Sequence, residues 1–156
     1  MIKIMFVCHG NICRSPMAEF VMKEIVKKAG MEKEFHIESG ATSREEIGNP
    51  VYLPVQRLLA EYGISCDGKY ARQMTLDDYK NYDYIIAMDN NNLRNIDKII
   101  GSDTENKVHL LLSYTGKSES VADPWYTRNF RAAWKDIHNG CQAFFAYLTE
   151  NKEREY

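Results

Sequence analysis

The sequence has no long apolar segment and no region in which charge of one sign gathers. Its apolar start, Ile4 to Val7, is much shorter than the roughly 7–15 residues of a signal-peptide core. No apolar run approaches the roughly 18 residues that indicate a membrane-spanning helix. The net charge is −2, and the basic residues are scattered. These features predict a cytoplasmic protein whose partners are neither membranes nor nucleic acids.

Cysteine and histidine are sparse, with four residues of each among 156. The cysteines form no CxxC pair, and their low density argues against a disulfide-based scaffold. The histidines lie far apart and show none of the spacings that are typical of zinc ligands. We therefore expect neither a metal ion nor any other cofactor.

Apolar residues make up 44% of the chain, which suits a single domain over residues 1–156 with one substantial core. Short apolar runs alternate with amphipathic segments, which is typical of an α/β fold with a parallel sheet and helices on both faces. Asp89 is interpreted as a plain helix N-cap. The expected strands are 3–7, 35–39, 83–87 and 108–112, and the expected helices are 16–29, 55–62, one that starts after Asp89, and 129–148.

The segment CHGNICRSP, residues 8–16, joins the first strand to the first helix and predicts a phosphate-binding loop. The N-terminus of a helix attracts anions through its unpaired backbone N–H groups and its dipole. Gly10 adds backbone freedom, and Asn11 tolerates a left-handed conformation better than most residues. Pro16 suits the first helical turn, where no N–H partner is lost.

Within this loop, Arg14 follows Cys8 by six positions, and its guanidinium can hold two phosphate oxygens. The positive field of the loop should favour the thiolate form of Cys8 near neutral pH. Ser15 can donate its hydroxyl to that thiolate and help it to depart from an intermediate. A cysteine taken alone is more often a small buried apolar residue, but this combination favours a nucleophile.

A second candidate segment is DPWY, residues 123–126. A departing phenolate needs a proton, and the carboxylic acid of Asp123 can supply it and then act as a base toward water. Trp125 and Tyr126 could form an aromatic wall against a substrate ring. Taken alone, an Asp-Pro pair is more often a turn. Because loops that follow parallel strands meet at one edge of the sheet, we expect Asp123 to lie near Cys8.

The motifs VCHGNICRSPMAE, SGATS, EIGNP, ARQ, YDYIIAMD and DPWY, in this order, resemble the low-molecular-weight protein-tyrosine phosphatases over almost the whole chain. The resemblance implies a three-layer α/β fold with a four-stranded parallel sheet flanked by helices (phosphotyrosine phosphatase I-like, Rossmann-like). It implies hydrolysis of phosphotyrosine-containing proteins without a metal, through a cysteinyl-phosphate on Cys8. Arg14 would bind phosphate, and Asp123 would be the general acid and base.

The resemblance also implies supporting residues around the nucleophile. Cys13 matches a second loop cysteine that protects the first on oxidation, so redox regulation is expected. The pocket wall would include Trp125, Tyr126 and Glu45. The residues expected to bind phosphate or support the loop are His9, Gly10, Asn11, Ile12, Cys13, Ser15 and Ser39.

Three residues depart from the family pattern. Lys69 stands where relatives often carry a histidine that helps to brace the loop. His9 occupies a position that is often apolar at the pocket wall, and Glu45 stands where many relatives place an aromatic residue at the rim. The bracing of the loop and the peptide preference therefore stay open, as does the oligomeric state.

Two related activities are alternatives. Thioredoxin-coupled arsenate reductases share the fold and the loop but pass a disulfide along a further pair of closely spaced cysteines, whereas Cys66 and Cys141 are isolated here. Protein-arginine phosphatases tend to have threonine where this chain has Ile12, whose apolar side chain favours an aromatic phosphoester. A module that only binds phosphotyrosine is disfavoured because the nucleophile, the arginine and the acid are all present.

Overall fold

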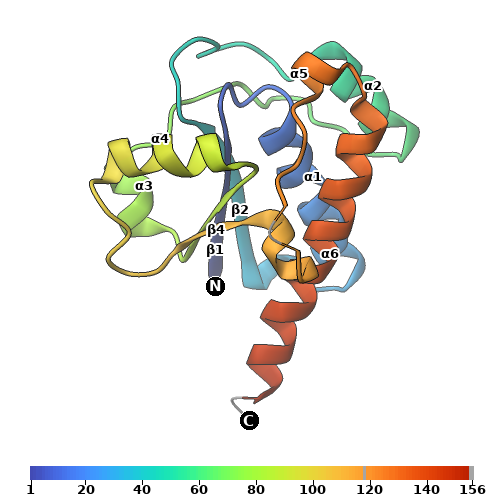
Figure 1. The fold of residues 1–156 in the computed structure, drawn as a ribbon. Helices are drawn as coiled ribbons and strands as arrows, with labels where there is room; N and C mark the ends of the chain where they lie inside the picture. The colour runs from blue at the N-terminus through green and yellow to red at the C-terminus, as the bar shows by residue number, and fades with distance from the viewer. Residues whose placement is uncertain (118, 155–156) are drawn as a thin grey trace.

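Four parallel strands form the centre of this computed structural model, which describes residues 1–117 and 119–154 (Figure 1). The strands pair in the order β2-β1-β3-β4, with β1 between β2 and β3. Because all pairings are parallel, the carboxyl ends of the strands lie at one edge of the sheet. The strands are β1 (Ile2–Cys8), β2 (Phe35–Ala41), β3 (Tyr84–Ala87) and β4 (Val108–Leu110).

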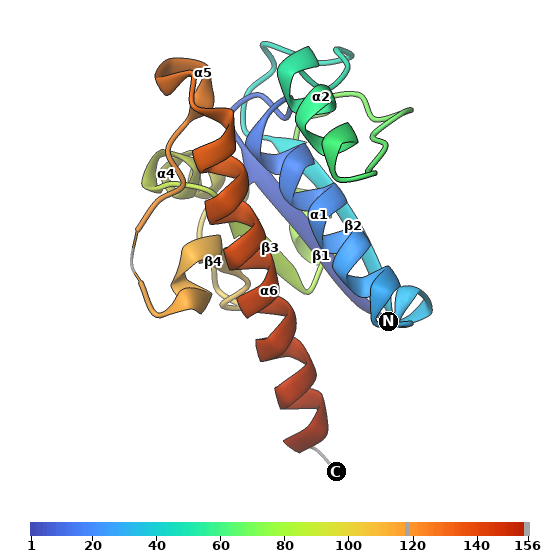
Figure 2. The same ribbon diagram turned by 90° about the vertical axis from the view of Figure 1, so that its right-hand side faces the viewer.

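Helices cover both faces of the sheet, which confirms the predicted three-layer α/β fold with a four-stranded parallel sheet (Figure 2). One face carries α1 (Arg14–Lys28), α2 (Leu53–Glu61) and α6 (Phe130–Arg154). The other carries α3 (Leu76–Asn81) and α4 (Asn90–Ile100). The short helical segments are η1 (Glu32–Glu34), η2 (Leu111–Thr115) and α5 (Pro124–Thr127).

The central strand β1 contributes to a core on each side of the sheet. Ile4, Phe6 and Cys8 pack into the core beneath α1 and α6, whereas Met5 and Val7 pack into the core beneath α3 and α4. A strand that is covered on both faces is apolar at every position, which explains the uninterrupted run in the sequence. The run ends at Cys8, so the sheet delivers this side chain directly to its carboxyl edge.

Several elements differ from the expected boundaries. Helix α1 begins at Arg14, two residues early, because Met17 N donates to Cys13 O and closes the first turn. Helix α6 continues to Arg154 instead of ending at 148. Helix α3 lies where none was expected, and the stretch 113–128 between the last expected strand and the last expected helix contains α5 and part of η2. Residue 118 of that stretch and residues 155–156 of the predicted domain lie outside the described residues.

Candidate active site

The loop after β1 brings donors to Cys8 at the N-terminus of α1. Cys8 Sγ lies 3.0 Å from Ser15 Oγ and accepts a 3.4 Å contact from Ser15 N. Asn11 adopts the predicted left-handed conformation, with φ of 60°. The expectation that Gly10 supplies unusual backbone freedom is wrong, since Gly10 has no positive φ. A Cβ atom at Gly10 would lie 3.3 Å from Glu46 Cγ, so a larger residue there would require a small shift of the Glu46 side chain.

Arg14 lies buried beneath the loop, with its side chain only 3% exposed. Its Nη1 donates to Asp89 Oδ2 and to Val121 O, both at 2.8 Å, and its Nη2 lies 3.4 Å from Asp123 Oδ2. Burial alone would lower the pKa of Arg14, but the neighbouring Cys8 and the bonded Asp89 raise it. The guanidinium therefore stays charged at the base of the site.

Asp89 has two roles, so its interpretation as a plain cap is incomplete. Its Oδ1 accepts a hydrogen bond from Asn92 N at 2.8 Å, which caps α4 as predicted. Its Oδ2 holds Arg14 from a position 75 residues away in the sequence. The cap of α4 thereby orients the arginine of the loop.

The other cysteines are buried. Burial, together with the neighbouring Cys8 and Asp123, raises the pKa of the Cys13 thiol to about 12. Burial also raises the pKa of Cys66 and of Cys141. These three side chains are therefore thiols at neutral pH.

A cavity of about 380 Å³ opens above the loop and brings together Cys8, Arg14 and Asp123. Asp123 caps α5, where its Oδ1 accepts from Trp125 N at 3.0 Å. Asn11, Ser15 and Ser39 do not line the cavity. The lining residues are Cys8, His9, Gly10, Ile12, Cys13, Arg14, Glu45, Glu46, Asp123, Trp125 and Tyr126.

One wall of the cavity is aromatic. The Trp125 ring packs against Tyr52 with 5.0 Å between the centroids, and the Arg128 guanidinium lies over both rings. Tyr52 N also donates to Ile12 O at 2.9 Å, which joins this wall to the loop. Tyr126 is 82% exposed and stands at the outer edge. Tyr52 and Arg128 are additions that the sequence motifs did not indicate.

The opposite rim is polar. His9 Nε2 lies 2.9 Å from Glu45 Oε2, and both side chains are largely exposed. Since a carboxylate can only accept, the His9 nitrogen is the donor. His9 and Glu45, which both depart from the family pattern, therefore pair with each other beside the cavity.

On the side away from the cavity, hydrogen bonds link Asn11 to three neighbours. Asn11 Nδ2 donates to Ser15 Oγ at 2.8 Å and to Ser39 Oγ at 2.9 Å. Asn11 Oδ1 accepts from Arg72 N at 3.2 Å. Ser39 Oγ in turn donates to Glu19 Oε1 at 2.5 Å.

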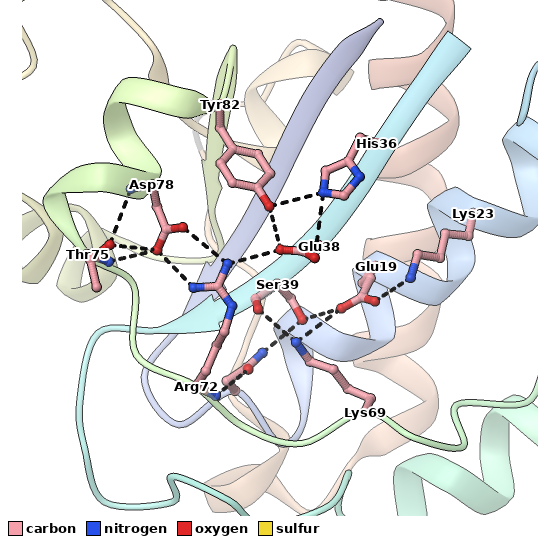
Figure 3. Close-up of polar contacts among 11 residues, drawn as sticks. Glu19, Lys23, His36, Glu38, Ser39, Lys69, Arg72, Thr75, Asp78 and Tyr82 are labelled. Carbon is pink, nitrogen blue, oxygen red and sulfur yellow. Dashed lines mark hydrogen bonds and ion pairs between the residues drawn. The ribbon is translucent and has the colours of Figure 1, made fainter. Parts of the chain in front are cut away.

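Lys69 joins this group, which answers the question left open by the missing histidine (Figure 3). Its Nζ donates to Ser39 O at 2.8 Å and lies 3.4 Å from Glu19 Oε1. Burial lowers the pKa of the Lys69 ammonium, an effect that Glu19 counteracts. The motifs did not single out Glu19; a charged side chain within the buried face of α1 was the available signal.

The Arg72 side chain fastens the segment that carries Lys69 to the rest of the fold (Figure 3). It donates to both carboxylate oxygens of Asp78, at 2.9 and 3.2 Å, and to Glu38 Oε2 at 3.0 Å. Tyr82 OH also donates to Glu38. These contacts hold Arg72 N in place for its bond to Asn11.

A larger hollow of about 970 Å³ lies on another side of the protein, over α1 and β2. Glu19 and Lys69 reach it, but Cys8 does not line it. Within residues 1–117 and 119–154, no three His, Cys, Asp or Glu side chains are grouped so that they could hold a metal ion. In the same part of the chain, no helix is both long enough and apolar enough to cross a membrane.

Comparisons with known proteins agree with this geometry. The family model for low molecular weight phosphotyrosine protein phosphatase matches residues 3–154. The Bacillus subtilis low molecular weight protein-tyrosine-phosphatase YfkJ is 38% identical over 98% of this chain and 99% of its own. Its crystal structure matches with a TM-score of 0.94 over 97% of each chain.

Two further solved structures are similar in fold and sequence. A low molecular weight protein tyrosine phosphatase from Streptococcus pyogenes is 39% identical, with a TM-score of 0.88 over 100% of this chain and 99% of that one. A Drosophila arginine phosphatase is 32% identical, with a TM-score of 0.87 over 94% and 98%. The match of nearly the whole chain to the family model, together with these relatives, shows that the chain belongs to the low molecular weight phosphotyrosine protein phosphatase family.

Proposed function

We propose that this protein hydrolyses phosphotyrosine in protein substrates through a cysteinyl-phosphate intermediate on Cys8. The observation that carries the proposal is the setting of Cys8 Sγ. It accepts from Ser15 N at the N-terminus of α1, lies 3.0 Å from Ser15 Oγ, and shares one cavity with Arg14 and Asp123. Donors and a helix N-terminus around a sulfur favour its thiolate form, which is the nucleophile.

Arg14 is suited to bind the phosphate. A guanidinium has five N–H groups, and the contacts to Asp89, Val121 and Asp123 among the described residues engage three of them. Two donors therefore remain for phosphate oxygens, and they would stabilise the charge that builds up in the transition state. Since Asp89 and Val121 fix the guanidinium beforehand, little reorganisation is needed when substrate binds.

The reaction proceeds in two steps. The Cys8 thiolate attacks phosphorus, the S–P bond forms, and the P–O bond to the tyrosine ring breaks while the protonated carboxyl of Asp123 gives its proton to the phenolate. Water then attacks phosphorus, the Asp123 carboxylate takes a proton from that water, and the S–P bond breaks to release phosphate. Ser15 Oγ, 3.0 Å from Cys8 Sγ, donates to the departing thiolate.

The test compares phosphate release from matched peptides that carry phosphotyrosine, phosphoserine or phosphoarginine. We expect phosphotyrosine to be preferred, because Ile12 and Trp125 offer apolar walls to an aromatic ring. Cys8→Ser should abolish turnover, whereas Cys66→Ser, a change at a buried cysteine away from the cavity, should not. Substantial activity in Cys8→Ser, or equal rates on all peptides, would contradict the proposal.

Hydrolysis of phosphoarginine is the second candidate, supported by the similarity to the Drosophila arginine phosphatase. The apolar Ile12 at the cavity wall argues against it, since a charged guanidinium gains little from an apolar contact. An arsenate reductase is less well supported, because Cys66 and Cys141 are both buried thiols. The need to keep Cys8 reduced favours a reducing compartment such as the cytoplasm.

A further inference from the structure

Glu19 is a buried carboxylate that the proposed mechanism does not use. Its side chain is 4% exposed and lies on α1, facing β2 and Lys69 (Figure 3). Oε1 accepts from Ser39 Oγ at 2.5 Å and lies 3.4 Å from Lys69 Nζ, and Oε2 accepts from Lys23 Nζ at 2.6 Å. Each of these three neighbours is a donor.

A carboxylate oxygen can only accept, and this determines the direction of the next hydrogen bonds. Ser39 has one hydroxyl proton and gives it to Glu19. The 2.9 Å contact between Ser39 Oγ and Asn11 must then be donated by the Asn11 amide nitrogen. The donation from Arg72 N to Asn11 Oδ1 requires the same amide orientation.

The second amide proton of Asn11 goes to Ser15 Oγ at 2.8 Å. Ser15 Oγ is therefore an acceptor toward Asn11, and its own proton is available to another neighbour. Two acceptors are in reach, Cys8 Sγ at 3.0 Å and Gly40 O at 3.4 Å. The thiolate is the nearer and the charged acceptor, so it takes the proton.

We propose that Glu19, together with the donation from Arg72 N to Asn11, sets the direction of the hydrogen bonds that run from α1 to the nucleophile, so that Ser15 donates to the Cys8 thiolate. Lys69, which contacts both Ser39 O and Glu19, keeps the accepting oxygen beside Ser39. Both are positioning residues, because neither is among those that line the cavity. The proposal rests on Cys8 being the nucleophile of the proposed function.

The loss of the proton donated by Ser15 and the loss of the Glu19 charge would shift the pH at which Cys8 becomes reactive in opposite directions. Removal of a nearby negative charge would by itself favour the thiolate and lower the pH at which Cys8 becomes reactive. Loss of the proton donated by Ser15 would disfavour the thiolate and raise that pH. The sign of the change therefore identifies which effect operates.

The experiment measures the rate of Cys8 alkylation by iodoacetamide against pH on the full-length protein, with peptide mass mapping to assign the label. Glu19→Met has a similar length and no acceptor, so the half-reactive pH should rise. At a pH below that midpoint, the rate should fall about three- to tenfold. Glu19→Gln keeps an accepting oxygen and should retain the wild-type profile.

Three further variants serve as controls. Lys23→Met removes the partner of Glu19 Oε2 but leaves the contacts of Oε1 with Ser39 and Lys69, so the profile should not change. Ser15→Ala should raise the half-reactive pH, and Glu19→Met should add nothing in that background, because it acts through Ser15. If Glu19→Met does not fold, Glu19→Met/Lys69→Met removes both buried ions together and should show the same rise.

An unchanged or lower half-reactive pH in the Glu19→Met proteins would overturn the proposal. So would a shift of equal size in the Ser15→Ala background. Failure of the proposed function can be told apart from failure of this proposal. In that case phosphotyrosine would not be hydrolysed, while the half-reactive pH values of the variants would still change as predicted.

Discussion

Asp123 is held at the mouth of the cavity by two contacts of unequal length. Its Oδ1 accepts from Trp125 N at 3.0 Å, and its Oδ2 lies 3.4 Å from Arg14 Nη2. The side chain remains 27% exposed, so the carboxyl can exchange its proton with water. This arrangement places a carboxyl group beside Arg14 without isolating it from solvent, as the proposed role of an acid requires.

Replacement of Asp123 by asparagine should slow substrates whose leaving group needs a proton more than substrates whose leaving group does not. Asn can still accept from Trp125 N, but it has no proton to transfer to a phenolate. We expect kcat/KM for phenyl phosphate to fall about 10²–10⁴-fold. For p-nitrophenyl phosphate, whose leaving group needs no proton, the fall should be much smaller. Equal losses across a series of leaving groups, measured by steady-state kinetics, would rule out Asp123 as the acid.

Cys13 should protect Cys8 during mild oxidation. The raised pKa of Cys13, about 12, keeps it a thiol while Cys8 reacts with peroxide to a sulfenic acid. Oxidation removes the Cys8 charge, one cause of that raised pKa, so Cys13 becomes easier to deprotonate. Its sulfur can then attack the sulfenic acid, and a disulfide forms as water leaves.

We therefore expect dithiothreitol to restore activity to peroxide-treated wild type but much less to Cys13→Ser. Peptide mapping should find a Cys8–Cys13 linked peptide in the wild type before reduction. Matching recovery in the two proteins, with no linked peptide, would show that Cys13 only packs beneath the loop.

The residues of the site were predictable where a short motif carries them, but their bonds to distant elements were not. The loop 8–16 carries the proposed nucleophile, the arginine and the helix start in one segment, so its pattern alone suggests its chemistry. Asp89 looked like a complete cap because its bond to Asn92 is local, whereas its bond to Arg14 spans 75 positions. The bond between Ser39 and Glu19 likewise joins different elements, and no spacing rule indicates it.

At the scale of elements, the missed helices are the short ones. Helix α3 has six residues, too few for a clear apolar period, and it depends on a capping box between Thr75 and Asp78. Helix α5 has four residues, and its signals were an Asp cap followed by proline. The extension of α6 past 148 follows from a sequence with no glycine or proline to stop it.

The segment after β2 forms the acidic rim of the cavity and should influence peptide choice. Thr42 N donates to Cys8 O at 2.9 Å and Ser43 N to His9 O at 3.1 Å, so this segment is anchored to the loop. It places Glu45 and Glu46 at the cavity. We expect phosphotyrosine peptides with flanking lysines to react faster than matched peptides with flanking glutamates.

The preference for flanking lysines should be small, about two- to fivefold in kcat/KM, because exposed charge pairs contribute little binding energy. Glu45→Gln/Glu46→Gln should reduce the preference while leaving p-nitrophenyl phosphate, which has no flanking residues, nearly unaffected. If the double variant keeps the preference for flanking lysines, another surface of the protein determines that preference.

At the scale of the whole molecule, alternation of strands and helices predicted the parallel sheet but not its strand order. The strands β2 and β4 are less apolar than β1 and β3, since they carry His36, Glu38 and His109, but this pattern does not say which strands pair. The order β2-β1-β3-β4 places the ends of β1 and β3 side by side at the carboxyl edge. There the loop after β1 meets Asp89, which follows β3.

The face that carries α3 should make the fold sensitive to acid. Burial alone would raise the pKa of Asp103, but hydrogen bonds from Tyr79 OH, Lys107 N and Val108 N lower it from its ordinary 3.8. A lowered pKa in the folded state means that this stabilisation is present above the unfolded value and is lost as pH falls through the folded one.

We therefore expect the melting temperature to drop as pH falls below about 4. Asp103→Asn should cost about 1–2 kcal/mol at pH 7 and lose less on acidification than the wild type. Thermal melts of both proteins from pH 7 to pH 3 measure this. If the melting temperatures of the two proteins fall in parallel as the pH is lowered, Asp103 does not contribute to the acid sensitivity.

The covalent intermediate is the central claim, and rapid quenching tests it most directly. Asp123→Asn should form the intermediate from p-nitrophenyl phosphate, which needs no acid, but hydrolyse it slowly without a base. Acid quenching within the first turnover, followed by peptide mass mapping, should find one phosphoryl group on the peptide that contains Cys8 and none in Asp123→Asn/Cys8→Ser. Release of p-nitrophenol with no phosphorylated peptide, or a phosphoryl group on any other residue, would contradict the account.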